Sequence, residues 1–406
     1  MTYTQLLHRR VGGQLRRFLL LRPFGPGVEV DDPLHPPELP PYDAERDLAP
    51  RTPQFLQHAL QPEERGRPGA PGLPVTTSEL SVGCNLSGAC CSQYPVIPTT
   101  VEESRRAVET LRRLAPGAAP GRAEDAFAPV NPGRRDVLSP ILQGDGCPFL
   151  AQGACQVHKA GGAEAKPWTC RQFPLQVIHC GDHFEVSILP QCACAARTVT
   201  RGSGGDWPED PLRGLTSVPR VPDSVVVEGR RTLARGMYLQ WVRALADRLS
   251  APGLGEPALV LDSASQSLRV APGALTPGWL GELRARMLSE AERLEGYLDP
   301  AGPQPKGTRW VASLAEALLA DADAEPEPAP SDGLVLALAL RAHLLLELPA
   351  LGAALADLTR LARLASLSRT VAPAEAADAR FEPLTLLLYL WATTRWPVSS
   401  EGVTRP

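Results

Sequence analysis

The stretch Gly146–Pro174, GCPFLAQGACQVHKAGGAEAKPWTCRQFP, decides the fold expected for the N-terminal half of this chain. It carries Cys147, Cys155 and Cys170 among glycine, proline and small residues, and it has few large apolar side chains. Such a segment cannot fold tightly by apolar burial alone, because buried apolar surface supplies the main driving force for folding. A metal bound by thiolates can replace that driving force, since metal binding counts directly toward folding. The stretch therefore predicts a domain held together by metal.

The distribution of cysteine supports this interpretation. All nine cysteines of the 406-residue chain lie between Cys84 and Cys194. Cysteines that serve only as small core residues would be scattered along the whole chain. Disulfides, a metal site or redox chemistry are therefore the candidate reasons for the clustering. We expect a cytoplasmic chain, because the N-terminal apolar run FLLL is too short for a signal peptide. Persistent disulfides are uncommon in the cytoplasm, so the clustering and the odd cysteine count favour metal.

Composition argues against two classes of partner. The formal net charge is −4, acids and bases are interspersed, and the Arg, Ala and Gly content is typical of a GC-rich bacterial genome. No basic stripe predicts nucleic-acid binding. The most apolar run, residues 333–358, is interrupted by Arg341, Glu347 and Pro349, so it predicts no transmembrane segment.

Shifts in composition divide the chain into four expected parts. Residues 1–75 are a Pro-rich N-terminal arm that could open with a short amphipathic helix, and residues 76–200 are a cysteine-cluster metal-binding domain. Residues 201–225 are a linker, and residues 226–406 form a helical domain with apolar helices around 334–369 and 383–395. The expected fold class is mainly α: a small metal-stapled α+β cysteine-rich domain followed by an all-α helical domain.

Two local elements can be placed inside the cysteine-rich part. Thr100 and Glu103 form a capping box for a helix that stops at Pro116-Gly117. Farther along, apolar residues alternate on both sides of Gly181-Asp182 in PLQVIHCGDHFEVSIL. We expect a β-hairpin there, with paired residue numbers that sum to 363.

This register makes a geometric prediction about the cysteines. Residue 170 would lie opposite residue 193, so the hairpin would bring Cys170 back beside Cys192 and Cys194. Residues at the turn would be carried roughly 30 Å away, at ~3.3 Å per residue. We therefore expect Cys180 to be a free thiol, and we exclude three turn residues from the site of Cys170: His179, Cys180 and His183.

The spacing of the cysteines does not choose the metal. Zinc sites usually show two short-spaced cysteine pairs, whereas this chain has C-x5-C-C, C-x7-C, C-x14-C and C-x-C. Adjacent Cys90 and Cys91 would rarely bind one tetrahedral ion together, but they could serve two metals or two irons of one cluster. An iron–sulfur cluster and zinc both remain open.

The motif CNLSGACC, with the later GCPFL, GACQVH and KPWTCRQFP, resembles the YkgJ-type cysteine-cluster family, a domain for chelating zinc or iron. The family's second cysteine would fall on Ser87, its usual tyrosine on His158, and its usual arginine on Lys166. The resemblance implies metal ligation by the matching cysteines, and the hairpin register adds Cys192. The candidate ligands are Cys84, Cys90, Cys91, Cys147, Cys155, Cys170 and Cys192.

The long gap between Cys155 and Cys170, and the run EVSILPQC from Glu185 to Cys192, are similar to the flagellin lysine N-methylase branch of this group. That branch implies methylation of a protein substrate with S-adenosylmethionine as the methyl donor. Three hypotheses result: a metal-binding cysteine-cluster protein with an iron–sulfur cluster or zinc, a lysine N-methyltransferase, and a metal sensor or chaperone. The sequence names no catalytic or S-adenosylmethionine-binding residue.

Overall fold

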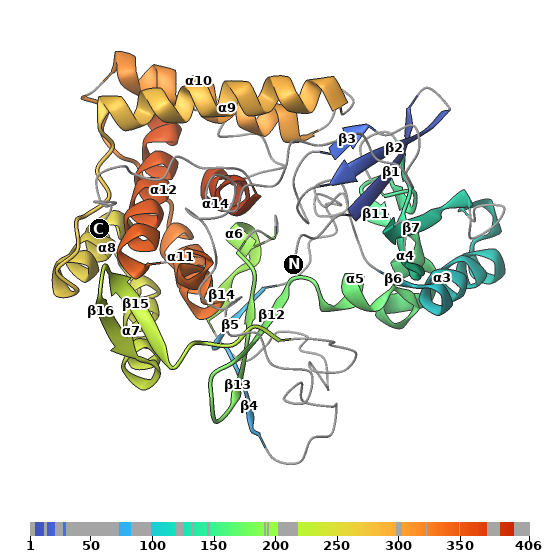
Figure 1. Ribbon diagram of the computed structural model, residues 1–406, viewed down its shortest axis with the longest axis horizontal. Helices are drawn as coiled ribbons and strands as arrows, with labels where there is room; N and C mark the ends of the chain where they lie inside the picture. Colours follow the sequence, from blue (N-terminus) through green and yellow to red (C-terminus); the bar gives the residue numbers. More distant parts are fainter. Residues whose placement is uncertain are drawn as a thin grey trace. The chain divides into compact units, whose positions relative to one another are not determined.

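The described part of the chain is a mixed α/β fold in which helices predominate and several small sheets occur (Figure 1). Helices were expected to predominate, but the strands are too numerous for a mainly α class. No described helix is long and apolar enough to cross a membrane. The computed structural model describes residues 5–11, 14–20, 27–29, 73–82, 99–118, 125–131, 134–143, 147–190, 192, 195–201, 218–297, 303–321, 323–348, 350–371 and 382–393.

The chain divides into two compact units that interleave along the sequence. Boundaries after Cys84 and after Phe173 cut the cysteine segment, residues 76–200, so that its two ends belong to unit 2 and its middle belongs to unit 1. Unit 1 comprises Met1–Pro41, Asn85–Phe173 and Met287–Trp310, and unit 2 comprises Tyr42–Cys84, Pro174–Arg286 and Val311–Pro406.

The N-terminus of unit 1 is a β-hairpin, so the amphipathic helix considered for this segment is wrong. Strands β1 (Gln5–Val11) and β2 (Gln14–Leu20) pair antiparallel, and Val11 lies opposite Gln14. The sequence signal is the pair Gly12-Gly13 between two apolar runs, because glycine pairs favour two-residue hairpin loops and disfavour helix. The sheet is completed by β3 (Gly27–Glu29) and β9 (Leu142–Gln143), in the order β3-β2-β1-β9.

Helix α3 (Val101–Leu114) of unit 1 confirms the predicted capping box. The Glu103 amide donates to Thr100 Oγ1 at 3.1 Å, and the Thr100 amide donates to Glu103 Oε2 at 3.0 Å. The apolar face of α3 packs in a core cluster with Phe127, Phe149 and Val157. The other elements of this region are β6 (Thr99–Thr100), η3 (Pro116–Ala118), β7 (Phe127–Asn131), β8 (Arg134–Pro140), β10 (Leu150–Ala151), β11 (Ala154–Cys155), α4 (Gln156–Ala165) and α5 (Trp168–Gln172).

The predicted hairpin of unit 2 is confirmed with its register. Strands β12 (Leu175–His179) and β13 (Phe184–Ile188) pair antiparallel from Leu175↔Ile188 to His179↔Phe184, and each pair sums to 363. Strand β4 (Val75–Thr77) adds to β13 in parallel. Every residue of β13 is buried, because other elements cover both faces of this strand. Two further pairs, β5 (Leu80–Ser81) with β14 (Thr200–Arg201) and β15 (Ser224–Glu228) with β16 (Arg231–Ala234), and the short helix α6 (Ala195–Thr198) also belong to unit 2.

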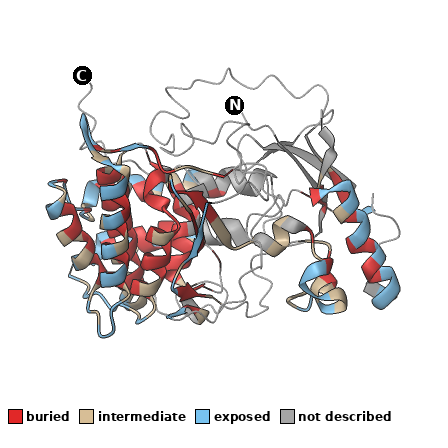
Figure 2. Ribbon diagram, turned by 90° about the horizontal axis from the view of Figure 1, so that it is seen from below, coloured by how far each residue is buried: buried red, intermediate tan, exposed pale blue. Residues whose placement is uncertain are grey.

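A helical core of leucine and alanine makes up most of the rest of unit 2, as the apolar periodicity predicted. Helices α11 (Asp332–Arg341) and α12 (Leu351–Val371) are almost entirely buried, and α12 packs against α8 (Pro257–Ser267) and α14 (Pro383–Thr393) (Figure 2). Helix α7 (Arg235–Leu249) packs on α11. The remaining helical elements are α9 (Pro277–Tyr297), α10 (Pro303–Ala320) and η5 (Leu344–Glu347).

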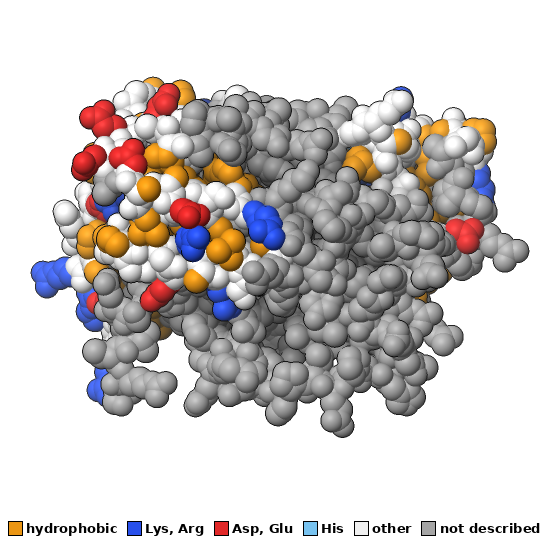
Figure 3. Space-filling model, turned by 90° about the horizontal axis from the view of Figure 1, so that it is seen from above, with side chains coloured by type: hydrophobic (Ala, Val, Ile, Leu, Met, Phe, Trp, Pro, Cys, Tyr) orange, Lys and Arg blue, Asp and Glu red, His pale blue; other side chains and the backbone are white. Residues whose placement is uncertain are grey.

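The helical core also contains a buried ion pair. Arg360 and Asp357 are both buried and pair at 3.1 Å, and Trp391 Nε1 donates to the other oxygen of Asp357 at 2.9 Å. On the outside, charges of both signs are interspersed over the described surface drawn in Figure 3. Loss of the charge on either Arg360 or Asp357 would therefore leave the other charge buried and unpaired.

Candidate metal centre

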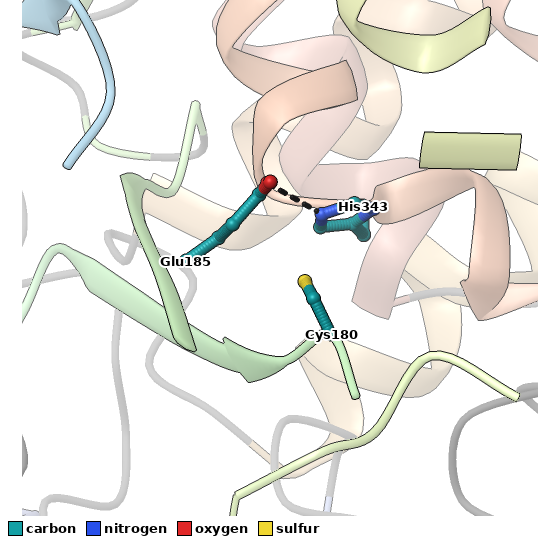
Figure 4. A group of neighbouring side chains, drawn as sticks. All are labelled: Cys180, Glu185 and His343. Carbon is teal, nitrogen blue, oxygen red and sulfur yellow. Dashed lines mark hydrogen bonds and ion pairs between the residues drawn. The ribbon is translucent and has the colours of Figure 1, made fainter. Parts of the chain in front are cut away.

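The turn between β12 and β13 brings Cys180 and Glu185 to one buried place. Cys180 is 2 % exposed and Glu185 is 8 % exposed. The Cys180 amide donates to the His183 carbonyl at 2.8 Å, which closes the turn. Gly181 has φ of +108°, a backbone conformation that glycine adopts without a Cβ penalty. The turn therefore directs the thiol back toward the carboxylate of β13 (Figure 4).

The third member of the group, His343, follows the last turn of α11. It is 1 % exposed and has left-handed backbone angles, φ 53° and ψ 32°. This conformation costs a non-glycine residue roughly 1–2 kcal/mol, and such residues are concentrated at functional sites. Its amide donates to the Leu340 carbonyl at 2.9 Å, where the helix ends. The imidazole of His343 points at Glu185 (Figure 4).

The three side chains form a compact set of donor atoms. One ligand atom each of Cys180, Glu185 and His343 lies within 4.8 Å of the other two, and all three residues are buried. Glu185 Oε2 is 3.1 Å from His343 Nε2. In the part of the chain that the structure describes, no other group of three or more His, Cys, Asp or Glu residues meets this condition. The set offers sulfur, nitrogen and oxygen, and it could hold a metal ion.

Two neighbours hold the other oxygen of Glu185. Arg243 of α7 donates to Oε1 from Nε at 3.0 Å and also from Nη2, and His183 Nε2 is 3.2 Å from the same oxygen. His183 Nδ1 in turn is 2.6 Å from Asp182 Oδ1. These contacts occupy Oε1, so Oε2 is the oxygen that faces His343.

A buried tyrosine fixes the imidazole of His343. Tyr238, also on α7, is 0 % exposed, and its hydroxyl is 3.2 Å from His343 Nδ1. The rings are tilted against one another with centroids 5.7 Å apart. With Nδ1 engaged by the phenol, Nε2 is the nitrogen available to a ligand, which is the arrangement that metal-binding histidines usually have.

Burial sets the protonation states of the group without metal. Burial raises the pKa of the Cys180 thiol far above its ordinary range, and the neighbouring Glu185 carboxylate raises it further. Burial also tends to raise the pKa of Glu185, but hydrogen bonds from His343, Arg243 and His183 outweigh it and leave that pKa well below its usual range. The metal-free group thus holds a neutral thiol beside an ionised carboxylate, and a metal would displace the thiol proton.

The cysteines that the sequence nominated lie elsewhere or outside the described residues. Cys84, Cys90, Cys91 and also Cys194 fall outside them. Within unit 1, half-buried Cys147 and Cys155 pack beside the core cluster of α3, and half-buried Cys170 lies in α5. Cys192 is buried in unit 2. The described donor group includes none of the nominated ligands, so their ligation stays a prediction.

The geometric argument that paired Cys170 with residue 193 is wrong. Strand pairing ends at Leu175↔Ile188, with one further bond from the Leu189 amide to the Pro174 carbonyl at 2.7 Å. Upstream, Trp168–Gln172 is a helix that follows Pro167, so Cys170 is not on a strand. Pro is compatible with the start of a helix, and this helix prevents the extended pairing from continuing back to Cys170.

Sequence reasoning also missed the donor group, because it took Cys180 for a free thiol. The signal for Glu185 was an acid inside an otherwise apolar strand, and the signal for His343 was a histidine inside the apolar run LALALRAHLLLEL. Neither signal names a partner. His343 and Glu185 are 158 residues apart, and only folding brings them together.

Comparisons with protein-family models, curated proteins and solved structures found no match to this chain. The similarity to the YkgJ-type family and to the lysine N-methylases therefore stays a prediction from motifs. The described residues define a mixed α/β protein with a buried sulfur, nitrogen and oxygen donor set that could hold a metal ion.

Proposed function

We propose that this chain is a metal-binding protein that holds one Zn²⁺ ion through Cys180 Sγ, Glu185 Oε2 and His343 Nε2. The observation that carries the proposal is the convergence of three different donor atoms, from a hairpin and from a helix end, within 4.8 Å in a buried place. A buried thiol, carboxylate and imidazole that meet in this way offer the sulfur, oxygen and nitrogen donors that divalent transition metals bind.

The donor chemistry favours zinc over a cluster. Thiolate, imidazole and carboxylate are all common zinc ligands, with bonds of about 2.0–2.3 Å, so donors of a tetrahedral ion lie about 3.4 Å apart. Glu185 Oε2 and His343 Nε2, 3.1 Å apart, are close to that spacing. Iron–sulfur clusters require several cysteine sulfurs, and this group has one. Three protein ligands also leave a fourth position for water or another ligand, as in catalytic zinc sites.

The alternative is a buried polar network that holds no metal. Glu185, Arg243 and His343 satisfy one another by hydrogen bonds, and such a network could exist for stability alone. Cys180 argues against that reading, because the hydrogen bonds to the Glu185 carboxylate come from Arg243, His183 and His343, and the thiol of Cys180 supplies none of these three. A ligand role explains why a thiol points at this carboxylate.

The hypotheses that came from the sequence motifs are affected differently by the proposed site. The proposed site agrees with the predicted metal binding through thiolate, but it uses different residues. The iron–sulfur cluster, the lysine N-methyltransferase activity with S-adenosylmethionine and a protein substrate, and the sensor or chaperone role stay predictions of the motifs and spacing.

The test is metal stoichiometry of the full-length chain. The protein is stripped with a chelator, titrated with Zn²⁺ and assayed by elemental analysis, in parallel with Cys180→Ala and His343→Gln. We expect each variant to bind one zinc fewer per chain than the wild type. Circular dichroism of the stripped proteins checks that both variants remain folded.

A matched variant, Cys155→Ala, separates this site from the predicted cysteine set. It removes a half-buried cysteine of unit 1 and leaves the three proposed ligands intact. We expect it to keep the zinc that Cys180→Ala loses. A wild type that binds no zinc, or a folded Cys180→Ala variant with the full wild-type stoichiometry, would overturn the proposal.

A further inference from the structure

Arg243 links the buried donor group to solvent. Its side chain is 41 % exposed, whereas that of Glu185 is 10 % exposed. The guanidinium uses Nε and Nη2 on Glu185 Oε1, and Nη2 also lies 2.9 Å from His183 Nε2. These bonds occupy one edge of the planar group. Within the described residues no hydrogen bond engages Nη1, so this nitrogen remains available to a ligand.

The charges of the occupied group leave a positive excess beside the ion. Zn²⁺ with the Cys180 thiolate, the Glu185 carboxylate and a neutral imidazole is formally neutral. Arg243 then adds one positive charge in direct contact with Glu185. The charge of Asp182 also acts on Arg243, but this side chain is 91 % exposed and pairs with His183 Nδ1, so solvent screens it. An anion of one charge would neutralise the excess.

We propose that the occupied metal site binds a small monocarboxylate, with one carboxylate oxygen on the fourth position of the ion and the other on Nη1 of Arg243. This inference rests on the proposed function, because the ion supplies the first anchor. An arginine N–H gives a carboxylate oxygen a charge-assisted hydrogen bond, which is roughly twice as strong as a bond between neutral groups. The Arg243 side chain is accessible from solvent, because it is 41 % exposed.

The test uses Co²⁺ in place of zinc, because the visible absorption of Co²⁺ reports its coordination. The stripped full-length protein is loaded with Co²⁺ and titrated with acetate, and separately with phosphate. We expect acetate to change the spectrum saturably. Arg243→Gln should weaken acetate binding about tenfold or more, since it removes a charged hydrogen-bond donor. The control Arg248→Gln, an exposed residue of the same helix, should bind acetate like the wild type.

The outcomes separate the two proposals. If Co²⁺ does not bind, or binds equally well to His343→Gln, the proposed function fails. If Co²⁺ binds at the site but acetate leaves the spectrum unchanged, the proposed function survives and the carboxylate inference fails. Equal acetate affinity in wild type and cobalt-loaded Arg243→Gln, or a response to phosphate stronger than to acetate, would also overturn the inference.

Discussion

Replacing Tyr238 by Phe tests whether the hydroxyl of this α7 residue orients His343 in the metal centre. The variant keeps the buried ring and removes only the hydroxyl that lies 3.2 Å from His343 Nδ1. The loss leaves a buried ring nitrogen without this partner, which costs about 1–3 kcal/mol of unfolding free energy in the metal-free protein. The imidazole also loses the contact that orients it toward Glu185.

The metal affinity provides the sharper measurement. Removal of a group that orients a metal-binding histidine typically weakens metal binding 10–100-fold, or about 1.4–2.7 kcal/mol. With zinc at about 100 times the wild-type dissociation constant, binding adds about 2.7 kcal/mol to stability. A tenfold weaker site would gain only about 1.4 kcal/mol at the same concentration. The zinc-induced rise in melting temperature should therefore fall by about half or more in Tyr238→Phe.

The assay is a competition titration with a chromophoric zinc chelator, together with thermal melts with and without zinc. Thr359→Val is a suitable control, because it also loses a buried hydroxyl, one that donates to the Leu355 carbonyl within α12. That variant should lose stability and keep its zinc affinity. If Tyr238→Phe is folded and binds zinc as tightly as the wild type, the phenol does not orient His343 and the reasoning fails.

Three further predictions concern stability. The pKa of Glu185 is depressed in the fold, so its ionised form contributes fully to the unfolding free energy above the unfolded-state pKa of about 4.3. This contribution is lost as the pH falls from there toward the folded-state pKa. The unfolding free energies of metal-free wild type and Glu185→Gln should therefore converge in urea titrations as the pH is lowered below about 4.3. Asp357→Asn should cost about 3–5 kcal/mol, because Arg360 stays buried and charged. Asp247→Asn should cost about 1 kcal/mol or less, because the carboxylate of that pair with Arg341 is 63 % exposed, and equal losses in denaturant titrations would contradict this difference. Gly181→Ala should lose about 1–3 kcal/mol in the same titrations, since φ of +108° disfavours any side chain, and an unchanged midpoint would refute the strain.

Local pattern determined those elements whose stabilising contacts lie within a few residues. The capping box of α3 needs only Thr100 and Glu103, and the register of β12 and β13 follows from period-two alternation around one turn. The N-terminal segment shows the limit of this reasoning, because short apolar runs match both a helix and a strand. There the pairing of β1 with β2 decided the outcome.

The buried donor group depended on tertiary structure. Cys180 and Glu185 share a hairpin that the sequence predicted, but their third partner follows α11, and 158 residues separate it from Glu185. A histidine inside an apolar run and an acid inside an apolar strand each indicate an unusual burial without naming a partner. The packing of α7 and α11 beside the hairpin brings His343, Tyr238 and Arg243 to Glu185. Sequence patterns report on residues within one or two turns of each other. The buried polar groups of this site are stabilised by contacts between residues far apart in the sequence, and only folding creates these contacts.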